Sequence, residues 1–138
     1  MTAFLRMQNL EQQAGKMLRS RGYTPVIVSH FVRSSRYIAF NLTARRTQND
    51  GSGETVMVKL KISLCRIESH DDATVFCQDE IAIVKRFFDR VPPDGELLRF
   101  EVWLAIPLAG FQQFEITRDG IREIPVSEEP GHRKERAA

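Results

Sequence analysis

The sequence predicts a single α/β domain in which helices flank a central mixed β-sheet. Three observations predict this class. The N-terminal segment repeats apolar residues at helical spacing, two alternating segments are joined by a turn at Asp50-Gly51, and a second amphipathic segment separates them from further alternating segments. A chain of 138 residues with 42% hydrophobic content can build one core. We expect the domain at 1–125 and a disordered polar tail at 126–138.

The first helix is expected to run from about Thr2 to Arg21. Its apolar residues recur at steps of three and four, and Gly22 supplies a stop signal. Glu11 lies about 100° around the helix from its apolar neighbour, which places it at the rim of the apolar face.

The second helix is expected to begin at the N-cap candidates of Ser69–Asp72 and to end near Val91. Pro92-Pro93 follows it and cannot continue a helix. An apolar stripe that includes Cys77, Ile81 and Val84 is expected to face the sheet.

Strands are expected where apolar and polar residues alternate, or where β-branched residues gather. In the third strand Val56, Val58, Leu60, Ile62 and Leu64 are expected to point inward. The expected strands are Tyr23–Phe31, Tyr37–Arg45, Thr55–Cys65, Leu97–Ile106, Phe111–Thr117 and Ile121–Ile124. The second helix would then cross over between the third and fourth strands.

The hairpin of the second and third strands has an unusual polar face. A turn centred on Asp50-Gly51 places Asn41 opposite Lys59, with Lys61 on the same face. An amide and two ammonium groups can contact phosphate, but they form a poor metal site because Mg²⁺ prefers carboxylate oxygens. Lysines on an outer strand face are also common as solvation or edge protection, and the pattern leaves both interpretations open.

Charge is distributed unevenly along the chain although the net charge is only +2. Residues 1–66 carry eleven Lys and Arg against three Asp and Glu, whereas residues 67–138 carry nine against fifteen. If the first half shares one face, that face is positive and suits a nucleic-acid backbone. The alternative is that the two halves interleave in space and neutralise each other.

The remaining features of the sequence are consistent with a cytoplasmic protein. The sequence contains no apolar run long enough for a transmembrane helix, and its two cysteines form no framework of disulfides. His30, His70 and His132 have no metal-ligand spacing, and we expect no metal and no cofactor. Trp103, Phe111 and Phe114 fit either the core or a homodimer interface formed by the C-terminal strands.

The order of elements resembles that of the PD-(D/E)xK nucleases, the restriction-endonuclease-like superfamily, and most closely the archaeal Holliday junction resolvases. The resemblance implies an αβββαββ core. It matches Glu11 to the acid of the first helix and Lys61 to the motif lysine. Asn41 and Lys59 stand where the family has its metal-binding Asp and its second acid. The resemblance therefore implies a nuclease fold with a degenerate active site. Among nearby acids, Asp79 or Glu80 would be the replacement ligands if Mg²⁺ were still bound.

Three functions follow from these observations. The leading one is a non-catalytic nuclease-fold domain that binds duplex or branched DNA, and the others are a divergent metal-dependent endonuclease and a protein-interaction accessory domain. The residues expected to contact phosphate are Lys16, Arg19, Arg21, Arg33, Arg36, Arg45, Arg46, Lys59 and Lys61.

Overall fold

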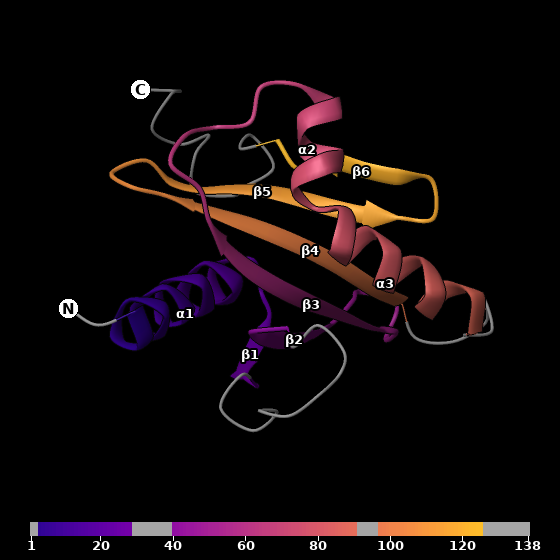
Figure 1. Ribbon diagram of the computed structural model, residues 1–138. Coiled ribbons are helices and arrows are strands. Elements are labelled where there is room, and N and C mark those ends of the chain that lie inside the picture. The colour runs from indigo at the N-terminus through magenta and orange to yellow at the C-terminus, as the bar shows by residue number, and fades with distance from the viewer. Residues whose placement is uncertain (1–2, 29–39, 91–96, 126–138) are drawn as a thin grey trace, which may run out of the picture.

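The computed structural model describes residues 3–28, 40–90 and 97–125. A six-stranded sheet is covered by helix α1 on one face and by α2 and α3 on the other (Figure 1). The elements are α1 (Ala3–Ser20), β1 (Thr24–Ile27), β2 (Leu42–Thr47), β3 (Gly53–Ile62), α2 (His70–Phe76), α3 (Gln78–Arg90), β4 (Leu97–Ile106), β5 (Gly110–Thr117) and β6 (Gly120–Glu123).

The strands follow the order of the sequence across the sheet, from β1 at one edge to β6 at the other. All neighbouring strands are antiparallel except β3 and β4, which are parallel. A parallel pair needs a crossover connection, and α2 and α3 supply it. The predicted α/β class, the mixed sheet and the position of the crossover are therefore confirmed.

The β2–β3 hairpin has the predicted register. Leu42 pairs with Val58 and Thr47 pairs with Gly53. The pairing ends at Leu42, because Asn41, which was expected opposite Lys59, donates its backbone N–H to the Val58 carbonyl over 2.9 Å. Strand β2 begins only at Leu42, and residues 37–39 of the longer predicted strand lie outside the described residues. The alternation of the predicted strand places Phe40 and Leu42 on one face, but they pack on opposite faces of the sheet because the chain bends at Asn41 before the strand begins.

Each face of the sheet has its own apolar core. Under α1 the core is formed by Ala14, Leu18, Tyr23, Leu42, Ala44, Val56, Val58, Leu60 and Trp103. Under α2 and α3 it is formed by Phe40, Ala73, Cys77, Val84, Phe100, Val102, Leu104, Phe114, Ile116 and Ile121. Two residues expected to point inward are exposed, Ile62 at 43% and Leu64 at 88%. Ile62 is the last residue of β3 and Leu64 lies beyond it, so strand alternation does not bury them there.

The predicted second helix is in fact two helices that meet at Cys77. Ser69 is the N-cap of α2, as predicted, since its Oγ accepts a hydrogen bond of 3.0 Å from the backbone N–H of Asp72. At the break, the Phe76 carbonyl accepts a 2.7 Å hydrogen bond from Lys61 Nζ. A side chain that inserts into the backbone ladder in this way is a known cause of helix kinks. Among the helices that the structure describes, none has the length and apolarity needed to cross a membrane.

Candidate functional site

A hydrogen bond joins helix α1 to the start of β2 in the interior of the protein. Asn41 Nδ2 donates to Glu11 Oε2 over 3.0 Å, while the backbone N–H of Leu60 donates to Asn41 Oδ1 over 2.8 Å. Glu11 is 2% exposed and Asn41 is 5% exposed. The amide therefore links α1, β2 and β3, and its carbonyl oxygen already accepts a backbone hydrogen bond.

A partly buried ion pair lies on the face of the sheet that α2 and α3 cover. Lys61 Nζ is 3.1 Å from Glu80 Oε1 and 4.6 Å from the centre of the Phe76 ring. Glu80 stands in the first turn of α3 and is 4% exposed. The break between α2 and α3 brings both the Phe76 carbonyl and the Glu80 carboxylate to the same ammonium group.

Lys59 connects the two parts of this site electrostatically. Burial lowers the pKa of its ammonium group, the charge of Glu80 raises it, Lys61 lowers it, and Glu11 raises it again, with a net lowering. We call Glu11, Asn41, Lys59, Lys61 and Glu80 the central cluster. Two carboxylates and two ammonium groups balance its formal charge. Contacts thus join Glu11 to Asn41 and Lys61 to Glu80, and Lys59 lies within electrostatic range of Glu11, Lys61 and Glu80.

The central cluster does not fit a divalent metal ion. The Asn41 carbonyl accepts from Leu60, the Glu80 carboxylate is paired with Lys61, and a cation at Lys59 repels Mg²⁺ at close range. Within residues 3–28, 40–90 and 97–125, no group of three His, Cys, Asp or Glu side chains is arranged to hold a metal. Asp79, the other acid considered, is exposed on α3.

The predicted phosphate-contacting residues do not share one face. Lys16 and Arg19 are exposed on α1. Ala44 packs toward α1, so strand alternation directs its exposed neighbour Arg45 to the opposite face of the sheet. Lys59 and Lys61 belong to the central cluster, and Arg33 and Arg36 lie outside the described residues.

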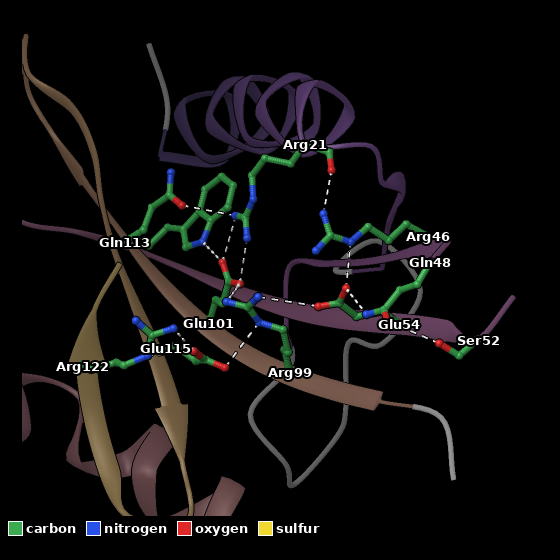
Figure 2. Close-up of polar contacts among 11 residues, drawn as sticks. Arg21, Arg46, Gln48, Ser52, Glu54, Arg99, Glu101, Gln113, Glu115 and Arg122 are labelled. Atoms are coloured by element: carbon green, nitrogen blue, oxygen red, sulfur yellow. Dashed lines mark hydrogen bonds and ion pairs between the residues drawn. The ribbon is translucent and has the colours of Figure 1, made fainter. Parts of the chain in front are cut away.

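Arg21 and Arg46 are engaged with buried carboxylates. Figure 2 shows Arg21 reaching from the end of α1 to Glu101, with Nη1–Oε1 and Nη2–Oε2 distances of 3.2 Å each. Arg46 Nε donates to Glu54 Oε2 over 2.7 Å, and its Nη1 donates to the Arg21 carbonyl over 2.8 Å. Both arginines hold the fold together, and we remove them from the phosphate-contacting set.

These two pairs belong to a larger polar network on the α1 side of the sheet (Figure 2). Arg99 lies 3.2 Å from Glu101, 3.6 Å from Glu54 and 3.3 Å from Glu115. Arg122 lies 2.7 Å from Glu115. Seven charged residues form this charge network, namely Arg21, Arg46, Glu54, Arg99, Glu101, Glu115 and Arg122.

Two pKa values respond to the charge network. Burial raises the pKa of the Glu54 carboxyl, but hydrogen bonds from Arg46 and Gln48 outweigh it and hold that pKa below its ordinary value. Burial and then the charge of Glu54 raise the pKa of the Tyr23 hydroxyl to about 12. No hydrogen bond with normal geometry reaches that hydroxyl among the described residues.

The charge network was missed at the level of sequence, although a signal was present. The predicted hairpin register also sets Arg46 opposite Glu54, and Glu115 is in register with both Glu101 and Arg122. The pairs Arg21–Glu101, Lys61–Glu80 and Arg66–Glu123 join the basic half of the chain to the acidic half. The two halves therefore interleave at these places, which was the alternative to a single positive face.

The aromatic residues of the C-terminal strands pack within the monomer. Trp103 and Phe114 are buried, and the Phe111 ring lies 5.5 Å from that of Trp103. Phe111 is only half-buried, and the expected homodimer stays a prediction. His70 is exposed at the start of α2, while His30 and His132 lie outside the described residues.

Comparison with known proteins gives no match, either to a protein-family model or to a curated protein.

Proposed function

We propose that this protein is a non-catalytic nucleic-acid-binding domain built on a restriction-endonuclease-like core. The observation that carries the proposal is the central cluster. Glu11 of α1 accepts a 3.0 Å hydrogen bond from Asn41, which directly precedes β2, and the charges of Glu80, Lys61 and Glu11 act on Lys59 of β3. The proximity of these residues and the helix–three-strand–crossover order of the elements support the proposal.

The chemistry of the cluster supports loss of catalysis. Metal-dependent nucleases of this kind need ions that activate water and stabilise the leaving oxygen. Here ammonium groups compensate the carboxylates of Glu11 and Glu80, which is the role a divalent cation would have. We therefore interpret the central cluster as a stabilised polar core. In this proposal nucleic acid binds at the surface of the protein and not at the cluster.

Lys16 and Arg19 are the described cations best placed for phosphate contact. Both are exposed on α1 and both line a single cavity between this helix and β1. Contacts of this type position a protein on the backbone without reading sequence. Two such contacts predict roughly a tenfold loss of affinity between 50 and 200 mM salt.

Fluorescence anisotropy with a labelled duplex and a labelled four-way junction tests the proposal. At 50 mM salt we expect binding of at least one of them and at least a tenfold loss of affinity in K16E/R19E. The matched control is K85E/R86E, which makes the same charge change at exposed positions of α3 on the other side of the sheet. No binding to either DNA, or equal losses in the two variants, would contradict the proposal.

Glu80 favours a second candidate, a divergent metal-dependent endonuclease. It is the acid that would replace the missing strand carboxylates, and it lies in the central cluster on Lys61. Lys59 would have to withdraw for a metal to enter. Incubation of branched and linear DNA with Mg²⁺ or Mn²⁺ tests this candidate. Cleavage that E80Q abolishes would establish it over the non-catalytic proposal, and intact DNA in every case would remove it.

A further inference from the structure

A cavity of about 340 Å³ lies between α1 and strands β1 and β2, outside the central cluster but sharing Glu11 with it. Lys16 and Arg19 border it from α1. Its apolar wall is formed by Pro25, Ile27 and Leu42. Pro25 lies beside Gly15, which stands midway between Glu11 and Arg19 in the sequence of α1.

The two ends of the cavity differ in charge. Glu11 and Arg19 are eight residues apart, and a rise of about 1.5 Å per residue separates them by about 12 Å along the helix axis. One end has the cations Lys16 and Arg19, and the middle is apolar. Glu11 lines the other end, where its carboxylate already accepts a hydrogen bond from Asn41 and has further lone pairs that can accept from a ligand. A ligand with an anion at one end, a flat apolar body and an N–H donor at the other end matches this sequence of groups.

Gly15 adds to the open space of the cavity. It stands inside α1 and lines the cavity, where glycine costs the helix about 1 kcal/mol relative to alanine. A methyl group at this position would lie 3.7 Å from Pro25 Cγ and 3.8 Å from Leu42 Cδ2, which is ordinary van der Waals contact. Neither a clash nor a left-handed backbone requires glycine here, so the room that it leaves in the cavity is its remaining structural effect.

We propose that this cavity binds one unstacked nucleotide of a nucleic acid, with the phosphate at Lys16 and Arg19 and the edge of the base at Glu11. The inference rests on the proposed nucleic-acid binding and names the part of the nucleic acid that the cavity takes. Carboxylates accept from the exocyclic amine of cytosine, and bases outside a duplex are the ones that a pocket can hold. Strand ends and branch points supply such nucleotides.

Isothermal titration calorimetry with deoxycytidine monophosphate tests the assignment, with deoxycytidine and inorganic phosphate as separate arms. We expect the nucleotide to bind at least tenfold more tightly than either part. In G15A the nucleotide should bind at least threefold more weakly, while the melting temperature rises by about 3–6 °C because alanine favours the helix. The affinity of K16M/R19M for the nucleotide should be at least tenfold lower than that of the parent protein, and K85M/R86M should bind the nucleotide like the parent.

Two results would overturn the assignment. The first is no nucleotide binding at millimolar concentration. The second is unchanged affinity in G15A together with equal affinity for phosphate alone, which would mean an anion on surface cations and an unused cavity. If either occurs while duplex or junction DNA still binds, only the nucleotide site fails. If DNA binding is also absent, the proposed function fails with it.

Discussion

Glu101 is completely buried, and Arg21, Arg99 and the indole N–H of Trp103 contact its carboxylate. Removal of one partner from a buried ion pair leaves the other charges uncompensated, which typically costs 3–5 kcal/mol. We expect E101Q to lower the free energy of unfolding by about 3 kcal/mol in urea titrations, a large share of the stability of a domain this size.

The exposed pair Arg66–Glu123 provides the control for this prediction. Its side chains are 48% and 40% exposed, and such surface pairs contribute about 1 kcal/mol or less. E123Q should therefore change stability far less than E101Q. Similar losses in both variants would show that the charge network adds no more than an ordinary surface pair.

Tyr23 gives the protein a pH response in the alkaline range. The unfolded tyrosine loses its proton near pH 10, whereas the folded one holds it until about pH 12. Between these values the unfolded state binds fewer protons, so stability falls as pH rises. We expect Y23F to flatten this fall in melting curves recorded from pH 9 to 11.5. The same slope in both proteins would mean that Tyr23 titrates alike in the folded and unfolded states.

The α2–α3 junction is the element that sequence reasoning failed to resolve. The apolar spacing across Cys77 is continuous, so it predicts one helix, and only the third dimension shows that Lys61 reaches the Phe76 carbonyl. By contrast, the hairpin register was predictable because the turn residues and the alternation of both strands agree. Local patterns set the elements, whereas partners distant in sequence set the kink and the charge network.

The junction should loosen when Lys61 is replaced. Cys77 is buried there and burial raises its thiol pKa to about 11, so alkylation proceeds from a locally opened state. In a C65S background, in which Cys77 is the only cysteine, we expect K61M to raise the iodoacetamide labelling rate about tenfold. That factor corresponds to loss of one charged hydrogen bond. K85M is the exposed control, and equal rates in K61M and K85M would show that Lys61 does not hold the junction.

At the scale of the whole molecule, the uneven charge along the chain largely disappears in the fold. Arg21 and Lys61, from the basic half, form buried or partly buried ion pairs with carboxylates of the acidic half. Strand alternation and helix coverage distribute the remaining described cations over two faces. Composition therefore predicted more positive surface than the described residues show. The pairing of β2 with β3 was predictable from the turn and the alternation of both strands, whereas the contact of Lys61 with Glu80 depends on the break at Cys77.

At the scale of the whole molecule, the nuclease resemblance implies that the backbone around the central cluster has the arrangement of a metal site. The double variant N41D/K59E restores both missing acids and so supplies this site with carboxylate oxygens, which are ligands that Mn²⁺ accepts. Without metal, four carboxylates would face Lys61 alone, and we expect the melting temperature to fall well below that of the parent. Saturating Mn²⁺ should raise it again by several degrees, since a ligand that binds only the folded state stabilises it.

The parent protein, titrated with Mn²⁺ under the same conditions, shows how much of the effect is unspecific. The single variant N41D keeps Lys59 and gives a milder test if the double variant does not fold. We expect N41D to gain less from Mn²⁺ than the double variant, because the ammonium group of Lys59 still repels the ion. If Mn²⁺ changes the melting temperature of all three proteins equally, the backbone around the central cluster does not have the arrangement of a metal site. The resemblance would then rest only on the order of helices and strands.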